Sequence, residues 1–459
     1  MGLLSHPIDV TPILEKDVKD RNMPVFQEMK TCPTHNQKVD RIVKQLKERP
    51  DSTPVSLKKN IASHQVPKPK DRKYLDHKIY VGGLDEIIHI DPDSRTCVAE
   101  PVVTYADLVD ATMRFGLVPI IVPEFRTITI GGAVAGCSIE SMSFRYGGFH
   151  DTCEEYEVIT ANGEVLHCAP DNENSMLFHM VHGTFGTLGI ISKLKFKLIP
   201  AKPFVRVRFE KYQDLSDFKD AIWYHFSKTD IDFMDAFIHS PDEYVINTGN
   251  FVDEAPYIHK YGWKRVFCSS SKKLEEMYLR TPGYFFRYDR GVTRGRFLTS
   301  HRTLDLVEKL HSIIPSRLIP ITTDLFIPFS RVDEFMGWYK SDVDHFPLWC
   351  VPYKKVRNYE WLSEEFIRKT NDRLFLDLAI YGMKNRDKSK NYYRIIEEEL
   401  KKIGGMKTLI SNNYYSESEF WKIWNRENYY KVKKQTDPDN IFRDLYTKTC
   451  KTSMGQPAW

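Results

Sequence analysis

The sequence predicts an α+β protein of two main domains, and three observations support this fold class. The chain has 459 residues, more than one compact core usually holds, and 41% of them are hydrophobic. Short apolar segments of strand length alternate with amphipathic helical segments along the chain. No early strand–helix–strand unit with a G-x-G-x-x-G turn is present, so a doubly wound nicotinamide-binding domain is not expected.

The first half of the chain predicts a helix followed by a set of short strands. Apolar residues recur at helical spacing over residues 39–46, which indicates an amphipathic helix. Thr104 and Asp107 form the pattern that starts a second helix. Asn162 and Gly163 interrupt an alternating segment and are a strong signal for a hairpin. Segments of strand length lie at 54–57, 87–90, 97–100 and 117–122.

A domain boundary is expected near Pro200, where an alternating segment of apolar residues and lysines ends. Beyond it, strand-like and helical segments follow one another, which predicts a sheet covered by helices. The last helix is expected to begin at Ser416, with Glu419 as its capping partner, and to end at Asp437. Predicted strands lie near 205–209, 233–238, 244–246, 347–352 and 374–381, and predicted helices at 214–227 and 392–403.

Composition and charge exclude several classes of function. Lysine and arginine number 66 against 62 acidic residues, a net charge of +4, so nucleic acid is not an expected partner. The eight cysteines form no C-x-x-C pair, so neither a metal site nor a disulfide framework is expected. No apolar segment is long enough to span a bilayer, so we expect no transmembrane segment and a cytoplasmic location, with peripheral membrane contact left open. The oligomeric state is not indicated.

The most informative segment is PEFRTITIGGAVAGCSIESMSFRYG, at residues 123–147. It places three glycines close together with only small residues between them, and three serines follow. Glycines let a backbone approach a ligand closely, and hydroxyl groups can bind the oxygens of a phosphate. A bare G-G-x-x-x-G pattern is more often a structural turn, but this combination also suits a cofactor that contains a pyrophosphate.

Together with Asp151 and the segment GTFGTLGI at residues 183–190, this segment resembles the flavin-binding domain of the vanillyl-alcohol oxidase and p-cresol methylhydroxylase superfamily. Within that superfamily the resemblance is to the delta-24 sterol reductase (diminuto-like) branch, and it includes PLWCVP at 347–352. It implies FAD as the cofactor and a bipartite FAD-binding domain with an inserted α+β substrate cap. The implied division is an N-terminal helical segment at 1–53, the FAD-binding domain at 54–200, the cap at 201–410, and a C-terminal segment at 411–459 that returns to the FAD domain.

The resemblance also implies which residues bind the cofactor. The family places its pyrophosphate loop at Ser63 and His64, and some relatives use a histidine there to bond the isoalloxazine methyl group. We expect contact between His64 and the flavin without a covalent bond, although a histidine without a role in a polar loop would look the same. The full set of expected cofactor-binding residues is Ser63, His64, Thr129, Gly131, Gly132, Gly136, Ser138, Ser141, Tyr146, Gly147, Gly189 and Ile190.

Five residues are candidates for a catalytic role. Reduced flavin carries negative charge near N1, so a cation there would stabilise it; Lys354 and Lys434 are candidates, and a solvated surface lysine is an equal alternative. Asp324 and Asp377 interrupt apolar strands, and Tyr381 follows Asp377 on the same strand face. These side chains could orient a substrate or supply a proton, or they could be structural carboxylates with satisfied hydrogen bonds.

The expected activity is reduction of a carbon–carbon double bond in a small, lipid-like substrate, with electrons from NAD(P)H, as the resemblance implies. Two alternatives stay open. One is an FAD-linked oxidase or dehydrogenase that acts on an alcohol of the alditol or lactone type. The other is a flavin-binding protein without turnover.

Overall fold

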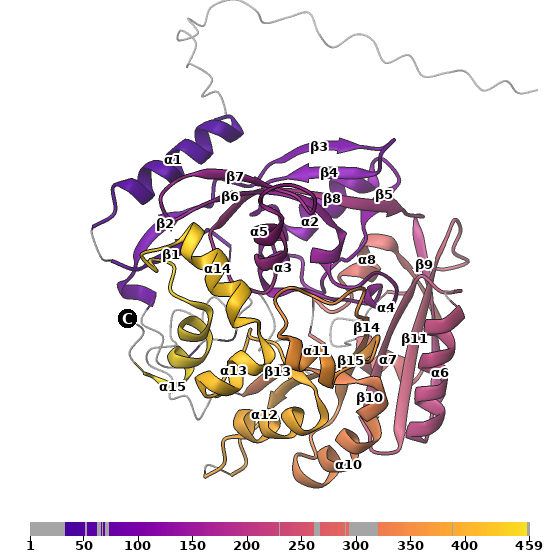
Figure 1. The fold of residues 1–459 in the computed structure, drawn as a ribbon. Helices are drawn as coiled ribbons and strands as arrows, with labels where there is room; N and C mark the ends of the chain where they lie inside the picture. The colour runs from indigo at the N-terminus through magenta and orange to yellow at the C-terminus, as the bar shows by residue number, and fades with distance from the viewer. Residues whose placement is uncertain are drawn as a thin grey trace, which may run out of the picture.

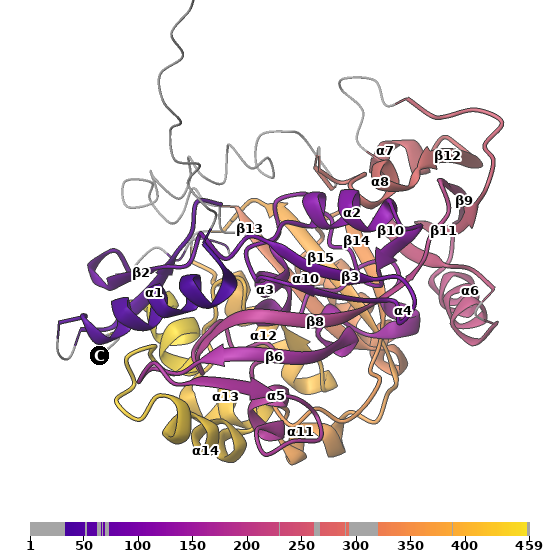
Figure 2. The same cartoon turned by 90° about the horizontal axis from the view of Figure 1, so that it is seen from above.

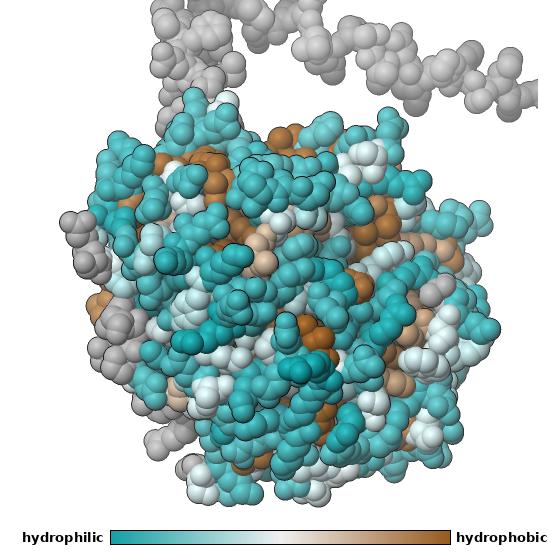
Figure 3. All heavy atoms as spheres, in the orientation of Figure 1, coloured by the Kyte–Doolittle hydropathy of each residue, from teal (hydrophilic) through white to brown (hydrophobic). Residues whose placement is uncertain are grey.

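A computed structural model describes residues 33–50, 53–61, 66, 68, 73–228, 230–260, 267–289, 291–292, 320–387 and 389–456. These residues form two large sheets and one small sheet, with helices packed on them (Figure 1). The predicted α+β class is therefore confirmed. Hydrophilic residues cover most of the face seen in Figure 3, where hydrophobic residues form only small separate groups.

The first large sheet has the strand order β3-β4-β8-β6-β7, with β5 paired to the end of β8. The helix α1 lies beside it; its capping box is formed by Thr34 and Gln37, and it buries the predicted apolar side. The predicted hairpin is confirmed, since Asn162 and Gly163 connect β6 to β7 and Gly163 has a φ of +80°. The elements of this part are α1 (His35–Lys47), β1 (Val55–Lys58), η1 (Lys73–Leu75), β2 (His77–Tyr80), β3 (Ile87–Asp91), β4 (Thr96–Ala99), α2 (Tyr105–Met113), β5 (Leu117–Pro119), α3 (Ile130–Gly136), α4 (Ser143–Tyr146), η2 (Phe149–Thr152), β6 (Cys153–Ile159), β7 (Val165–Cys168), α5 (Ser175–Met180) and β8 (Ile190–Pro200).

The strand predicted at 117–122 is shorter than expected, because β5 ends at Pro119. It pairs with β8 only from Leu198 to Pro200. From Phe196 to Leu194, β8 pairs with β4 on one edge and with β6 on the other, so β5 cannot continue its pairing along this strand. Residues 120–122 are nevertheless buried and lead into the glycine segment.

The second large sheet has the order β12-β9-β11-β10-β14-β15-β13-β16, and Figure 2 shows the first sheet, in purple, in front of its orange strands. Neighbouring side chains on a strand point to opposite faces. On β15 the residues Leu374, Leu376 and Leu378 pack with the helices α10 and α12 on the outer face. The intervening Phe375 and Ala379 pack on the inner face, which lies toward the first sheet. The elements are β9 (Phe204–Tyr212), α6 (Leu215–Lys228), β10 (Phe233–Ser240), β11 (Glu243–Val252), α7 (Phe267–Ser271), β12 (Glu276–Arg280), α8 (Thr281–Phe285), β13 (Ile321–Pro328), η4 (Phe329–Arg331), α10 (Val332–Asp342), β14 (Leu348–Lys354), α11 (Glu364–Lys369), β15 (Leu374–Met383), α12 (Tyr392–Ile403) and β16 (Met406–Lys407).

The C-terminal helices, in yellow in Figure 1, pack against the first part of the chain. Tyr429 donates a hydrogen bond to Thr187 Oγ1 at 2.9 Å, and Lys433 Nζ donates to the carbonyl oxygen of Thr187 at 2.8 Å. The elements here are α13 (Glu417–Ile423), α14 (Arg426–Thr436), η5 (Thr447–Lys451) and α15 (Thr452–Met454).

The prediction of one helix from Ser416 to Asp437 is wrong, although its capping box at Ser416 is present. The backbone at Trp424 is extended, with φ −90° and ψ 145°, because this residue forms a β-bridge with Leu362. A new helix then starts at Asn425, whose side chain accepts from the N–H of Asn428.

Candidate active site between the two sheets

The glycine segment forms the short helix α3 at the seam between the two sheets. Thr129 caps this helix, and its Oγ1 accepts hydrogen bonds from the N–H of Gly132 at 3.3 Å and from Lys59 Nζ at 3.0 Å. Lys59 directly follows β1, so the lysine brings the start of the predicted pyrophosphate loop to the glycines. Lys59 was missed in the sequence, where only its position before Ser63 and His64 could have indicated it; those two residues lie outside the described residues.

The three glycines of α3 have different surroundings. A Cβ added to Gly131 would lie 2.5 Å from the Cβ of Pro101, so this glycine is required by packing within the protein. A Cβ on Gly132 would meet only Thr129 Oγ1, at 3.1 Å, and one on Gly136 nothing closer than 3.9 Å. Gly132 and Gly136 therefore leave space beside the backbone that a flat cofactor can approach, and in this respect the residues present fit FAD.

Four other predicted cofactor residues follow α3 in the sequence. Ser138 and Tyr146 are half-buried near the seam. Ser141 is buried, and its hydroxyl accepts a hydrogen bond from Tyr284 at 3.3 Å, which connects the glycine segment to the second sheet. A Cβ on Gly147, at φ +83°, would collide with Asp151.

Gly189 and Ile190 lie further back. A Cβ on Gly189 would be 2.6 Å from Val158 Cγ1, and Ile190 is a core residue of β8 paired with Ile159. Both positions are thus explained by packing of the first sheet.

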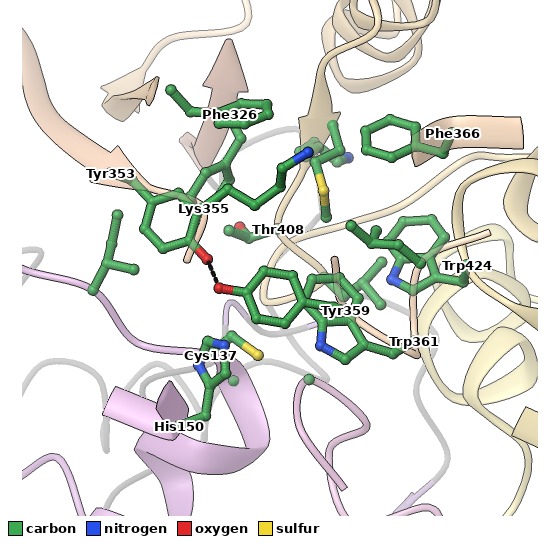
Figure 4. A pocket seen from close by; sticks show the side chains of 18 of the residues that line it. Cys137, His150, Phe326, Tyr353, Lys355, Tyr359, Trp361, Phe366, Thr408 and Trp424 are labelled. Atoms are coloured by element: carbon green, nitrogen blue, oxygen red, sulfur yellow. Dashed lines mark hydrogen bonds between the residues drawn. The ribbon is translucent and has the colours of Figure 1, made fainter. Parts of the chain in front are cut away.

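A cavity opens between the end of α3 and the inner face of the second sheet (Figure 4). About 830 Å³ of empty space lies there, counted together with the open mouth of the cavity. Aromatic and aliphatic side chains dominate its lining. They include Phe185, Phe326, Tyr353, Tyr359, Trp361, Leu362, Phe366, Ile367, Phe375, Met406, Leu409 and Trp424.

Three predicted catalytic residues come together beside this cavity. Asp377 lies directly opposite Phe326 on the neighbouring strand, and Asp324 interacts with Tyr381 and with Thr408, a residue of the cavity wall. The half-buried Glu124, which the sequence analysis did not single out, completes the group from the loop before α3. We call Glu124, Asp324 and Asp377 the carboxylate trio.

No cation among the described residues forms an ion pair with the carboxylate trio, although the charge of Arg287 acts on Glu124 from a distance. One oxygen of Asp324 and one of Asp377 are buried without a hydrogen-bond partner. Burial raises the pKa of Asp324 to about 6 and that of Glu124 to about 8. Burial and the nearby charge of Asp324 raise the pKa of Asp377 well above its ordinary value. At neutral pH Glu124 and Asp377 therefore hold their protons, whereas Asp324 takes up its proton only as the pH falls toward 6.

A second acidic group at the seam is built differently. The fully buried guanidinium of Arg287 lies 3.0 Å from Glu140 and 3.3 Å from Asp235. Asp235 also accepts from Tyr288 and, at 2.9 Å, from the indole of Trp349. We call Arg287, Glu140 and Asp235 the arginine triad. Because Glu140 follows α3 and Asp235 lies on β10, the triad fixes the glycine segment to the second sheet.

The two predicted cations lie apart from the trio. Lys354 is half-buried at the end of β14 and donates to the carbonyl oxygen of Arg145 at 3.3 Å. Lys434 is exposed on α14. Neither lines the cavity, whereas the neighbouring Lys355 does.

Comparison with known proteins agrees with the geometry of the site. Residues 29–169 match the family described as "FAD binding domain". The chain is 25% identical to the human Delta(24)-sterol reductase over 419 residues, which cover 82% of this chain and 78% of the relative. It is 23% identical to the Caenorhabditis elegans Delta(24)-sterol reductase homolog over 468 residues, 91% of this chain and 88% of the relative. Cytokinin dehydrogenase 9 of rice is 29% identical over 116 residues, 25% of this chain and 22% of the relative. No helix among the described residues has the length and hydropathy needed to cross a bilayer.

Proposed function

Because this chain is an FAD-dependent oxidoreductase of the vanillyl-alcohol oxidase and p-cresol methylhydroxylase superfamily, similar to the Delta(24)-sterol reductases, we propose that it reduces a carbon–carbon double bond of a lipid-like substrate. The electrons come from a nicotinamide dinucleotide. The observation that carries the proposal is the apolar cavity at the seam, with the carboxylate trio and its raised pKa values beside it.

The cavity suits a substrate with a large apolar body. Burial of such a body among aromatic side chains excludes water and is favourable by roughly 25 cal/mol per Å² of apolar surface. Two lining residues contact the trio: Phe326 lies opposite Asp377 on the neighbouring strand, and Thr408 donates to Asp324 at 3.5 Å. A substrate in the cavity is therefore one residue away from these two carboxyl groups.

The chemistry of the reduction divides between the cofactor and the chain. FAD, when bound, supplies a hydride to one carbon of the double bond. The other carbon needs a proton, and we assign its source to the carboxyl groups of Asp324 and Asp377. One NAD(P)H and one proton from solvent are consumed for each double bond reduced, and the carboxyl group is protonated again between turnovers.

The cofactor side of the proposal places FAD against Gly132 and Gly136, with Thr129 and Lys59 at the negatively charged pyrophosphate. Replacing Gly132 with leucine should expel FAD, because the new side chain would occupy the space beside the backbone. The matched control is Gly337→Leu, at an exposed position on α10 with no atom within 4 Å of an added Cβ. We expect the control to keep its flavin; a folded Gly132→Leu protein with stoichiometric FAD would refute this placement.

The direction of electron flow is tested with the purified holoenzyme under anaerobic conditions. We expect NADH or NADPH to bleach the yellow absorbance, and a lipid alkene to restore it; the first alkene to try is a sterol with a double bond at carbon 24, as named for the relatives. Bleaching by an alditol or lactone-type alcohol, with no response to nicotinamides, would favour the oxidase alternative. A flavin that no donor reduces would indicate binding without turnover.

A further inference from the structure

At one end of the cavity wall, the hydroxyl groups of Tyr353 and Tyr359 form a hydrogen bond (Figure 4), and Tyr359 forms a further hydrogen bond with Asp151. Tyr353 comes from the inner face of β14, and Tyr359 follows in the loop before α11. Their hydroxyl oxygens are 2.5 Å apart, and the hydroxyl of Tyr359 donates to Asp151 Oδ2 at 2.9 Å. The same carboxylate oxygen accepts from the N–H of Gly148 at 2.8 Å, which holds it in place.

In this series of hydrogen bonds, each hydroxyl donates its proton to the next group, from Tyr353 to Tyr359 to Asp151. A phenol has one proton to donate. The proton of Tyr359 is committed to Asp151, so the short contact between the two hydroxyls requires the proton of Tyr353. Burial raises the pKa of both phenols well above the ordinary value, so both keep their protons. The oxygen of Tyr353 is thereby left with acceptor capacity at the wall of the cavity.

We propose that the cavity selects ligands that carry a hydroxyl group on an apolar body, and that Tyr353 determines this preference by accepting the hydroxyl proton. A ketone of the same shape has no proton to donate and leaves the Tyr353 oxygen without a partner. An unpaired buried acceptor is costly, so the two ligands differ in affinity although they fill the same space.

A second polar group at the same wall supports this assignment. His150 lines the cavity and is 2% exposed; neither ring nitrogen forms a hydrogen bond within the described residues, and Nε2 lies 3.4 Å from Asp151 Oδ2. Its ring centroid lies 5.5 Å from that of Tyr359. Burial lowers the pKa of His150, so the ring is neutral and offers one donor and one acceptor. A ligand hydroxyl can donate to Tyr353 and also accept from His150, whereas a ketone can only accept.

The remainder of the lining is apolar, which sets the ligand class. The rings of Phe326, Phe366 and Phe375 and the indoles of Trp361 and Trp424 provide surface for a hydrocarbon skeleton. The preferred ligand is therefore an alcohol with a compact hydrocarbon body. The inference rests on the proposed function only in placing the substrate in this cavity, and it concerns binding rather than turnover.

The test compares three ligands of the same bicyclic skeleton on the FAD-loaded protein: the alcohol 2-decalol, the ketone 2-decalone and the hydrocarbon decalin. Dissociation constants follow from the change in flavin absorbance, with calorimetry as a second readout. We expect the wild-type protein to bind the alcohol roughly five- to tenfold more tightly than the ketone, the value of about one hydrogen bond. Decalin should bind no more tightly than the ketone.

Two isosteric variants should abolish this discrimination by opposite routes. In Tyr353→Phe the affinity for the alcohol should fall to that for the ketone, because the acceptor is gone. In Tyr359→Phe the affinity for the ketone should rise, because the proton of Tyr353 loses its acceptor and can turn into the cavity. The control is Tyr339→Phe on the outer face of the second sheet, whose hydroxyl donates to the carbonyl oxygen of His345, and it should leave the ratio unchanged.

Equal affinities of the wild-type protein for alcohol and ketone would overturn the proposal. So would an unchanged ratio in the two variants, or a loss of FAD from Tyr353→Phe without a change in ligand preference. If Tyr353→Phe does not fold, Tyr359→Phe still tests the proposal: a rise in its affinity for the ketone supports the proposal, and an unchanged affinity contradicts it. Because the assay needs no turnover, a preference for the alcohol in a protein that reduces no alkene would support this inference while refuting the proposed reaction.

Discussion

The arginine triad and the carboxylate trio are two buried acidic groups at the same seam, and they differ in one respect. In the triad, the guanidinium of Arg287 lies within 3.3 Å of both carboxylates. In the trio, no described cation forms an ion pair with Asp324 or Asp377, and their pKa values are raised. Two buried carboxylates without a cation stay stable by holding protons.

This difference separates a structural role from a chemical one. The guanidinium of Arg287 offsets the charge of Glu140 and Asp235 and fixes the glycine segment to the second sheet, although burial raises the pKa of Glu140 as well. A protonated carboxyl next to an apolar cavity is available for transfer to a bound substrate.

The largest effect is expected for Arg287→Met, which leaves Glu140 and Asp235 buried without their cation. Breaking one side of a buried ion pair costs roughly 3 to 5 kcal/mol, so the free energy of unfolding should fall by that amount. Urea denaturation measures it. The control is Arg331→Met, since Arg331 is 44% exposed and pairs only with the exposed Glu334 on the same helical turn; it should change stability by less than about 0.5 kcal/mol. An equal loss of unfolding free energy in the two variants would show that the triad does not stabilise the fold.

A smaller effect of opposite sign is expected for Asp324→Asn. The folded protein holds the pKa of Asp324 at about 6, above the ordinary 3.8, so the folded state binds more protons in this range. Its contribution to stability is therefore present at low pH and is lost as pH rises from 3.8 through about 6. The difference corresponds to roughly 3 kcal/mol, and the variant should be more stable than wild type at pH 8 by up to that amount.

The test is to measure the free energy of unfolding of both proteins by urea denaturation at pH 4.5 and at pH 8. We expect the wild-type protein to lose stability between these values more steeply than Asp324→Asn. Parallel pH profiles would show that Asp324 is ionised at low pH and does not hold a proton.

The smallest effect is expected for Tyr288→Phe, which removes one of the hydrogen bonds to Asp235 but keeps Arg287. A hydrogen bond to a charged group contributes roughly 1.5 to 3 kcal/mol, and Trp349 still donates to the same carboxylate, so we expect a loss near the lower value. A loss as large as that of Arg287→Met would mean that hydrogen bonds, rather than the cation, stabilise the triad.

The trio could be predicted in part from the sequence, whereas the triad could not. Asp324 and Asp377 interrupt apolar strands, and the period of two placed Asp377 and Tyr381 on one face. Arg287, Glu140 and Asp235 come from three distant segments, and no local pattern relates them. Sequence patterns report which face of an element is buried but not which elements meet.

The same limit applies to the rest of the site. The segment from Thr129 to Gly136 could be read from its glycines, but the different surroundings of Gly131 and Gly132 depend on Pro101, which packs from another loop. Tyr353 follows the PLWCVP segment and was missed, because its role depends on the proton direction set by Tyr359 and Asp151. The break at Trp424 was missed because its cause, the bridge to Leu362, is a tertiary contact.

The central proposal is that the carboxyl groups of Asp324 and Asp377, within the carboxylate trio, supply the proton for reduction. The most direct measurement is the anaerobic single-turnover rate of alkene reduction between pH 5.5 and 9, in wild type and in Asp324→Asn. We predict that the wild-type rate falls as pH rises through the range of the two pKa values, about 6 for Asp324 and about 8 for Glu124. The variant, with its FAD content unchanged, should be slower by roughly 100-fold or more at pH 6. A rate that is independent of pH and equal in the two proteins would contradict the account.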